Sequence, residues 1–303
     1  MEKERGITVK RALILGGTQF FGKRLVYKLL ENGTEVTIAT RGRTPDDFGD
    51  RVDRLIIDRE NKESIIKAFD NKKWDVVYDQ SCFSPLEAKS SYEALQGKIK
   101  HYVFTSTMAV YEFGRERKEE DFDPLLYKPS YKERKDYKGM SGYQEAKRSA
   151  EAYLFQTADV PVAAVRPALV IGLDDYTERF LFHVKKVKNE KPIGLADPGH
   201  FYSYTSSEDA AGFLYMAGEK NLTGAFNIAF EKSLSLNDLL HQIERAVGKK
   251  AIVTSDITKE NASPYGLAGE WTLDVSKAER AGYSLEKLNP YIECLIEEMK
   301  KET

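Results

Sequence analysis

Residues 12–33 read ALILGGTQFFGKRLVYKLLENG, an apolar run that passes through a glycine-rich turn into a segment of helical period. The run ALIL predicts a buried strand, and the leucines after the turn predict a helix with one apolar face. In such a turn Gly16 permits a tight reversal, and Gly22 lets the helix pack closely on the strand. The helix N-terminus then offers free N–H groups to a pyrophosphate. The stretch predicts a dinucleotide-binding turn, and the alternative is a strand-to-helix turn without a ligand.

Composition limits the partners of the chain. Its 303 residues are enough for one large domain or two modest ones. With 41% hydrophobic and 31% charged residues the chain is globular, and its net charge of −2 carries no basic excess. We therefore expect a small-molecule substrate, and a nucleic acid is an unlikely partner.

Cysteine and histidine are too scattered to form a disulfide framework or a metal site. The two cysteines are Cys82 and Cys294, and the four histidines are His101, His183, His200 and His241. The N-terminus, MEKERGITVKR, lacks the apolar core of a signal peptide, and no run approaches the roughly 18 apolar residues of a membrane span. We expect a reduced, metal-free, cytoplasmic protein without a membrane anchor.

Strand and helix patterns alternate through the first half of the chain. Strands are predicted at 12–17, 35–40, 54–58, 74–80, 101–107 and 160–172, and helices at 22–31, 62–70, 85–96 and 143–156. Continuous apolar strands joined by amphipathic helices indicate a parallel sheet with helices on both faces. The expected class is α/β, a doubly wound parallel Rossmann sheet with a smaller, mostly helical C-terminal substrate domain.

Two regions depart from this alternation. We expect residues 1–170 to form the dinucleotide-binding domain and residues 171–303 to be mainly substrate-binding, with some segments returning to the first domain. Residues 112–140 are dense in charge and are interpreted as an exposed loop or flap beside the active site.

The second strand ends at Thr40 and Arg41, where an NAD-selective site usually carries an acidic residue for the ribose hydroxyl. A 2′-phosphate could pair there with Arg41, assisted by Arg43, which favours NADP over NAD. The alternative is that Arg41 stacks on adenine or faces solvent. Asp58 closes the third strand, where this fold usually has an acceptor for the adenine amine, and it could equally be an ordinary turn residue.

Tyrosine four residues before lysine on a helix is a candidate proton-transfer pair. A phenol, with its usual pKa near 10, exchanges protons poorly at pH 7 unless a nearby cation stabilises the phenolate. The sequence holds three such pairs: Tyr131/Lys135, Tyr143/Lys147 and Tyr283/Lys287. We favour Tyr143 and Lys147, because they lie on a predicted helix between the fifth and sixth strands.

The fifth predicted strand ends at Ser106 and Thr107, at the edge of the sheet where ligands of open α/β sheets bind. We expect Thr107 to orient a substrate oxygen, Tyr143 to exchange its proton and Lys147 to stabilise the phenolate, while hydride passes between substrate and nicotinamide. Taken singly, each of these residues has an ordinary structural explanation. Their joint placement favours catalysis.

The chain resembles the NAD-dependent epimerase/dehydratase family, the extended short-chain dehydrogenase/reductases, over nearly its whole length. The matching motifs are GGTQFFG, TSTMAVY, YQEAK, VRPALVIG, YTSSEDAAGFL and AFNIAF. By the first motif the chain looks closest to the GGTxFxG branch, which also contains chloroplast stem-loop RNA-binding proteins. The resemblance implies bound NAD or NADP, catalytic Thr107, Tyr143 and Lys147, and substrate contacts from the C-terminal part. The predicted cofactor contacts are Gly16, Gly17, Thr18, Gln19, Phe20, Phe21, Gly22, Arg41, Asp58, Arg59, Ser81, Tyr143, Lys147 and Pro167.

Three positions depart from the pattern of the family. Gln19 stands where epimerases carry a middle glycine, which affects the phosphate geometry. Met108 and Ala109 replace the acidic pair of sugar dehydratases, which disfavours dehydration. Cys82 could act as an extra acid or base, although a lone thiol is more often buried filler.

The leading hypothesis is an NAD(P)-dependent epimerase or reductase that acts on a hydroxyl or keto carbon of a sugar or nucleotide sugar. The alternative is a non-catalytic dinucleotide-binding regulator or an RNA-associated protein of the same fold. Resemblance also suggests a homodimer formed by helices 85–96 and 143–156, whose apolar faces could equally pack internally.

Overall fold

The structure, a computed structural model, describes residues 9–301, so most of the charged N-terminal stretch lies outside it. The chain divides into two compact units. The first unit contains the described residues up to Tyr111, residues Glu119–Pro167 and Ala210–Asn227. The second contains Glu112–Lys118, Ala168–Asp209 and the residues from Ile228 on. The predicted division into domains at residue 170 stays a prediction.

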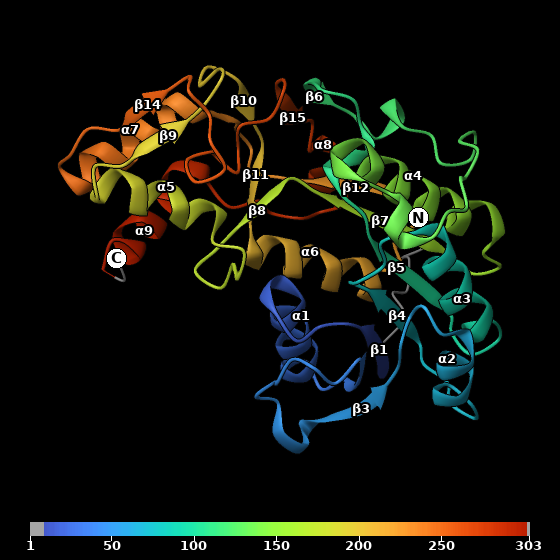
Figure 1. The fold of residues 1–303 in the computed structure, drawn as a ribbon. Coiled ribbons are helices and arrows are strands. Elements are labelled where there is room, and N and C mark those ends of the chain that lie inside the picture. The colour runs from blue at the N-terminus through green and yellow to red at the C-terminus, as the bar shows by residue number, and fades with distance from the viewer. Residues whose placement is uncertain (1–8, 302–303) are drawn as a thin grey trace. The chain divides into compact units, whose positions relative to one another are not determined.

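A seven-stranded sheet forms the centre of the first unit, in the order β12-β7-β5-β4-β1-β2-β3 (Figure 1). The pairings from β7 through β3 are all parallel. The order reverses between β1 and β4, which makes their carboxyl ends the switch point where ligands of doubly wound sheets bind. The strands are β1 (Arg11–Leu15), β2 (Glu35–Thr40), β3 (Val52–Ile56), β4 (Val76–Asp79), β5 (His101–Thr105), β7 (Val162–Pro167) and β12 (Gly224–Ile228).

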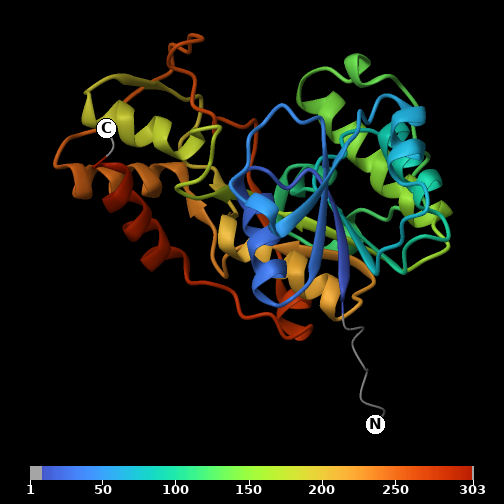
Figure 2. The ribbon, with the colours of Figure 1, turned by 90° about the horizontal axis from the view of Figure 1, so that it is seen from below.

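Helices cover both faces of this sheet. Helices α2, α3 and α4 lie on one face, and α1 and α6 lie on the other (Figure 2). Close packing is tightest at Gly218 of α6, where an added Cβ would collide with the hydroxyl of Tyr78 on β4. The helices are α1 (Phe20–Glu31), α2 (Lys62–Ala68), α3 (Pro85–Leu95), α4 (Gly139–Thr157) and α6 (Ser207–Glu219). The predicted doubly wound fold is confirmed.

The second unit combines helices with short strands. A four-stranded sheet has the order β13-β10-β15-β6, and β8 pairs with β11 and β9 with β14 in parallel. Its strands are β6 (Gly114–Arg117), β8 (Leu169–Ile171), β9 (Pro192–Gly194), β10 (Phe201–Tyr202), β11 (Tyr204–Ser206), β13 (Leu234–Ser235), β14 (Ile252–Thr254) and β15 (Trp271–Leu273). Its helices are α5 (Arg179–Lys188), α7 (Leu236–Val247), α8 (Ser276–Arg280) and α9 (Leu288–Met299).

Two predicted elements differ from the structure. The run 160–172 is not one strand, because it divides at Ala168 into β7 of the large sheet and β8 of the second unit. Helix α4 begins at Gly139, four residues before the predicted start, and Gly142 in its first turn packs against the backbone of Tyr137. Glycine has low helix propensity, so a sequence pattern reads these residues as loop.

Most residues of the stretch 112–140 are exposed, as expected of a loop, but the stretch also contains regular structure. It contains β6, two 3₁₀ turns at Glu119–Asp121 and Arg134–Asp136, and the start of α4. The fully buried guanidinium of Arg166, on β7, is paired with Glu151 and donates to the carbonyl oxygens of Glu119 and Phe122. A buried ion pair needs all its donors satisfied. Its need for acceptors therefore fixes residues 119–122 on the sheet of the first unit.

Buried histidine makes the stability of the first unit depend on pH. His101 opens β5, its Nε2 lies 2.8 Å from the carbonyl oxygen of Leu222, and burial lowers its pKa from 6.5 to about 4. In the unfolded chain the imidazole of His101 therefore takes up a proton below pH 6.5, whereas in the folded chain it does so only below about pH 4. This contribution to stability is complete above that window and is lost as the pH falls through it.

We expect His101→Gln to remove about 2 kcal/mol of the stability difference between pH 7 and pH 5. Glutamine can keep the hydrogen bond to the Leu222 carbonyl but does not titrate. Urea unfolding of both proteins at the two pH values measures the effect. His241→Gln, at an exposed position, is the matched control, and an unchanged pH dependence in His101→Gln would contradict the account.

Candidate functional site

In the turn after β1, the backbone conformation and the close packing leave little room for side chains at the glycine positions. Gly16 and Gly17 have φ angles of +104° and +88°, in the region that favours glycine. A Cβ on Gly17 would lie 2.8 Å from Cγ2 of Ile14, and one on Gly22 would lie 3.2 Å from Cα of Gly17. The positive φ angles therefore favour glycine at Gly16 and Gly17, and at Gly22 the first turn of α1 approaches the end of β1 closely.

The residues between Gly17 and Gly22 provide no side-chain cap for the N-terminus of α1. Gln19, at the N-cap, is exposed, its side chain makes no capping hydrogen bond, and the first turn of α1 carries no acidic residue. Phe20 has a φ of +52°, which is strained for an aromatic residue, and its ring packs on that of Phe21. Thr18 is half-buried beside them. The backbone N–H groups of the first turn of α1 are thus left without a side-chain cap, even though Gln19 stands in place of the usual glycine.

The end of β4 faces this turn from the other side of the switch point. Ser81 Oγ donates to the carbonyl oxygen of Leu15 at 3.1 Å, and a Cβ on Gly16 would lie 3.4 Å from Cβ of Ser81. The buried amide nitrogen and oxygen of Gln80 have no hydrogen-bond partner among the described residues. A bare backbone cradle beside an unpartnered amide fits a polar ligand such as a dinucleotide phosphate.

Arg41 and Asp58, the residues predicted to contact the adenine end of a dinucleotide, are both exposed. Arg41 is exposed and makes no ion pair within residues 9–301, while Thr40 Oγ1 accepts from Gly42 N–H at 3.0 Å. Asp58 is exposed and accepts from Glu60 N–H at 3.1 Å. The contacts of both with a cofactor stay predictions.

Arg59 has an internal partner that the sequence does not reveal. Its guanidinium is paired with the fully buried Asp79 and also donates to Ser81 Oγ at 3.2 Å and Ser91 Oγ at 3.1 Å. These contacts join the ends of strands and helices within the first unit. The predicted cofactor contact of Arg59 stays a prediction.

Lys147 is buried and held at two points. Its Nζ donates to the carbonyl oxygens of Thr105 at 2.7 Å and Cys82 at 2.9 Å, at the ends of β5 and β4. An ammonium has three N–H donors, so one remains for another acceptor. Tyr143 lies one helical turn earlier on α4 and is half-buried against the ring of Phe83, 5.9 Å away between centroids. Helix α4 thereby brings the phenol and the ammonium to the carboxyl edge of the sheet.

Thr107 follows β5 at the same edge. Its Oγ1 accepts from Ala109 N–H at 3.1 Å and its side chain is half-exposed. Gln144 and Arg148 of α4 donate to the carbonyl oxygens of Tyr111 and Val110, which docks the helix on the turn after Thr107. Ser106, by contrast, is buried and bonded to Glu151. Thr107, Tyr143 and Lys147 therefore share one region, and their catalytic roles stay predictions.

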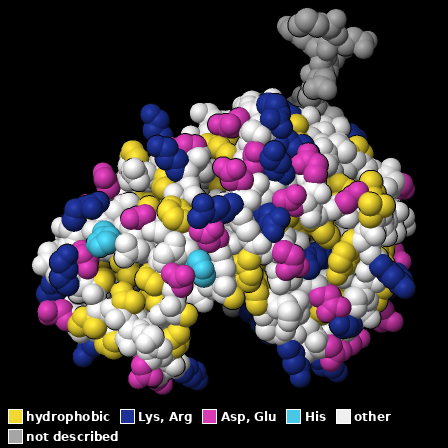
Figure 3. Space-filling view, turned by 90° about the horizontal axis from the view of Figure 1, so that it is seen from above, with side chains coloured by type: hydrophobic (Ala, Val, Ile, Leu, Met, Phe, Trp, Pro, Cys, Tyr) yellow, Lys and Arg dark blue, Asp and Glu magenta, His cyan; other side chains and the backbone are white. Residues whose placement is uncertain are grey.

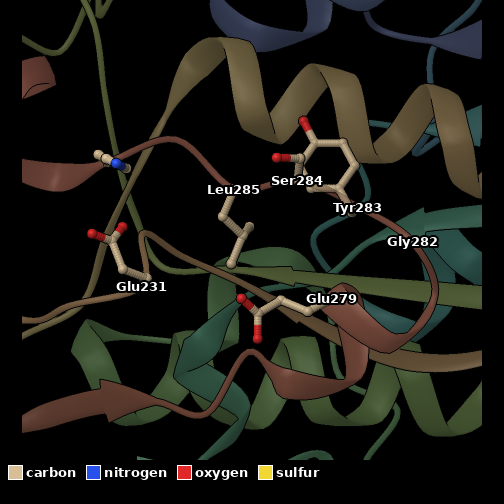
Figure 4. A pocket seen from close by; sticks show the side chains of 7 residues that line it. Glu231, Glu279, Gly282, Tyr283, Ser284 and Leu285 are labelled. Carbon is tan, nitrogen blue, oxygen red and sulfur yellow. The ribbon is translucent and has the colours of Figure 1, made fainter.

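The other two tyrosine–lysine pairs lie elsewhere. Tyr131 is exposed and outside any helix. Tyr283 and Lys287 line a shallow pocket of about 480 Å³ in the second unit, with Glu231, Glu279 and Leu285 (Figure 4). The Tyr283 hydroxyl donates to Asp209, and burial, reinforced by the charge of Asp209, raises its pKa far above the ordinary value. Of the three pairs, Tyr143 and Lys147 alone share one helix.

Cys82 contributes its backbone to the site. Its thiol is buried 3.5 Å from the carbonyl oxygen of Ser84, and burial raises the pKa of the thiol well above the ordinary value. This favours the interpretation as filler over that of an acid or base. Pro167 is buried as the last residue of β7, and its cofactor contact stays a prediction.

Sequence reasoning missed two side chains beside the site, Gln80 and Phe83. Both lie in the stretch YDQSCFSP directly after β4, next to Ser81 and Cys82. The signal was present, since every residue that follows a central strand reaches the ligand edge of the sheet.

The sheet order and the glycine turn are those of the doubly wound α/β class. The sequence profile described as "NAD dependent epimerase/dehydratase family" matches residues 12–229. The chain therefore belongs to the NAD-dependent epimerase/dehydratase family, which confirms the resemblance seen in its motifs.

The chain is also similar to a curated relative and to solved structures. The Arabidopsis thaliana protein "Chloroplast stem-loop binding protein of 41 kDa b" is 28% identical over 257 residues, which is 79% of this chain and 64% of that protein's length. The Thermus thermophilus UDP-glucose 4-epimerase with NAD has a TM-score of 0.74 at 20% identity, covering 97% of this chain and 100% of that one. The Thermotoga maritima UDP-glucose 4-epimerase with UDP-glucose has a TM-score of 0.75 at 18% identity, covering 96% and 99%. These structural likenesses show the fold.

Surface charge, helix hydropathy and the placement of possible metal ligands bear on the predicted partners. On the face drawn in Figure 3, lysine and arginine side chains are interspersed with aspartate and glutamate, and no continuous basic area is visible. Among residues 9–301, no helix is long and apolar enough to cross a bilayer, and no group of three or more histidine, cysteine or acidic residues could hold a metal ion. The predicted cytoplasmic location and homodimer stay predictions.

We expect Gly17→Ala to weaken dinucleotide binding at least tenfold, because the new Cβ would displace Ile14 and the turn with it. Gly33→Ala is the matched control, since Gly33 has a φ of +77° but no atom within 4 Å of the new Cβ. Both variants place alanine at a positive φ and so carry similar backbone strain. The comparison therefore isolates the effect of the new Cβ on the glycine turn of residues 16–22. NADH fluorescence titration measures the affinity, and equal binding by the two variants would contradict the assignment of the cradle.

Proposed function

We propose that the chain is an NAD(P)-dependent enzyme that epimerises or reduces a hydroxyl or keto carbon of a nucleotide sugar. The observation that carries this proposal is the Lys147 ammonium, held between the carbonyl oxygens of Cys82 and Thr105 with Tyr143 one helical turn away. A buried cation placed beside a half-buried phenol supports proton transfer by that phenol.

Each residue of the proposed site has a separate task. Tyr143 exchanges a proton with the substrate oxygen, and Thr107 Oγ1 orients that oxygen by hydrogen bonding. Lys147 stabilises the phenolate, and its third N–H serves a ligand hydroxyl. A nicotinamide dinucleotide, when bound, supplies the acceptor and donor of hydride. The glycine turn, Gln80 and Ser81 would hold its phosphates, and Pro167 would border the nicotinamide end.

The substrate class rests on the family and on what similar proteins bind. Two of the similar structures are UDP-glucose 4-epimerases, one of them with bound UDP-glucose. Met108 and Ala109, which follow Thr107, are buried and carry no acid or base, which argues against dehydration. A redox step at an alcohol carbon, followed by return of the hydride or release of the product, needs no further acid.

Replacing Tyr143 by Phe should lower turnover of UDP-glucose to its epimer, or of a keto-sugar to its alcohol, by at least about 100-fold. Binding of NADH should stay within about twofold, because the phenyl ring keeps the packing on Phe83. Tyr131→Phe, from the pair outside any helix, is the matched control and should keep full activity. NMR of the sugar products measures turnover; a Tyr143→Phe enzyme as active as Tyr131→Phe would refute the assignment.

We propose further that NADP is preferred over NAD through Arg41. β2 ends at Thr40 and Arg41 follows it, with no carboxylate at either position, and Arg41 is exposed and unpaired within residues 9–301. Arg41→Ala should weaken NADPH binding about 10- to 100-fold, the worth of a lost charge-assisted bidentate contact. NADH binding is the internal control and should change little. Equal losses for both nucleotides would contradict the preference.

RNA association is the rival function, favoured by the name of the Arabidopsis relative. The mixed charges on the face in Figure 3 and the net charge of −2 argue against it. Filter binding of a stem-loop RNA at 50 and at 200 mM salt separates the two. Strong binding that falls steeply with salt would favour the RNA-associated protein.

A further inference from the structure

Arg134 joins the segment before α4 to the start of α3. Its Nη1 donates to Oε1 of Glu87 at 2.5 Å, and its Cζ lies 4.5 Å from the ring centroid of Phe83. The arginine therefore makes an ion pair and a cation–π contact with residues that follow the end of β4.

Glu87 is the buried member of this pair. Its side chain is 3% exposed, against 49% for Arg134. Ser84 caps α3, and a glutamate three residues later usually reaches back to the N–H of the capping residue. Here Oε2 of Glu87 instead accepts from the backbone N–H of Phe83 at 2.9 Å. One carboxylate oxygen therefore accepts from the backbone N–H of Phe83 and also lies 3.8 Å from Nε of Arg59, while the other oxygen holds Arg134 over the ring of Phe83.

The ring of Phe83 in turn packs on Tyr143. Their centroids are 5.9 Å apart with an interplanar angle of 43°, and Tyr137 packs against Phe83 edge-on at 6.1 Å. Within residues 9–301, no hydrogen bond fixes the hydroxyl of Tyr143. Ring packing, rather than hydrogen bonding, therefore sets the position of the phenol in the absence of a ligand.

We propose that Arg134 and Glu87 are positioning residues for Tyr143, and that they act through Phe83. We call the three residues Arg134, Glu87 and Phe83 the latch. This inference rests on the proposed role of Tyr143 as the proton-transfer residue. Without Arg134 and Glu87, Phe83 loses the cation on one face and the anchor of its backbone, and Tyr143 gains freedom to leave its productive orientation. Small displacements of a catalytic group lower rates strongly.

Lys132 provides a matched control on the same segment. Its Nζ donates to both carboxylate oxygens of Glu145, at 2.7 and 2.8 Å, and lies 5.6 Å from the ring centroid of Tyr137. It thus ties the same segment to α4 by an ion pair and makes a cation–π contact within the segment, but it does not contact Arg134, Glu87 or Phe83.

The first experiment observes Tyr143 directly. The full-length protein is labelled with 3-fluorotyrosine, and among its 17 tyrosines the ¹⁹F resonance of Tyr143 is the one that Tyr143→Phe removes. We expect this resonance to shift or broaden in Arg134→Ala and in Glu87→Gln, and to stay in place in Lys132→Ala. An unchanged resonance in a folded Arg134→Ala protein would overturn the latch, whether or not the protein turns over a substrate.

The second experiment measures the consequence for catalysis. With UDP-glucose as the substrate, kcat should fall about 10- to 100-fold in Arg134→Ala while KM and NADH affinity stay within about twofold. Arg134→Lys, which keeps the charge, should recover part of the loss. A fall in thermal stability with unchanged kcat would make the pair merely structural and overturn the proposal.

The two experiments separate the latch from the proposed function. If the wild-type protein acts on no sugar nucleotide, the proposed function fails, and the fluorine resonance still decides whether the latch holds Tyr143. If the wild-type protein is active and the resonance of Arg134→Ala does not move, the latch fails alone.

Discussion

The Asp79 carboxylate, fully buried at the carboxyl end of β4, is the group on which the rest of the site depends. It pairs with Arg59 and accepts from the hydroxyl of Tyr102 at 2.6 Å and from the N–H of Cys82 at 3.2 Å. A buried charge is tolerated only when such partners surround it. Its demand for donors fixes the turn 80–83, which faces the glycine turn, holds Lys147 through a carbonyl and packs a ring on Tyr143.

Polar anchors of two kinds meet at this edge of the sheet. The first kind uses buried charges in pairs, such as Arg166 with Glu151 behind Ser106, which hold neighbouring segments in place. The second kind uses backbone carbonyls, which hold the ammonium of Lys147 without neutralising its charge. A carboxylate in their place would screen the positive charge from a phenolate. The site therefore keeps its cation available because its nearest acceptors are neutral.

Much of the fold was predictable, because alternating periodicity and glycine placement are local properties. The glycine turn of residues 16–22 and the order of strands and helices followed from them. The division at Ala168 was not predictable, since both halves of the run are apolar and only tertiary pairing assigns them to different sheets. At the site, the Tyr143–Lys147 spacing was visible in sequence, whereas the partnership of Arg59 with Asp79 joins residues 20 positions apart on separate strand ends. Their roles with a ligand stay predictions.

Strand β12 has a consequence for how the chain folds during synthesis. It lies beside β7 at the edge of the large sheet, but the ribosome makes it only after residues Ala168–Asp209 of the second unit and helix α6. Translation adds about 5–20 residues each second, so β7 waits several seconds with one edge unpaired. An unpaired edge can join another chain. The nascent protein is therefore open to aggregation at this edge until its own later strand arrives to cover it.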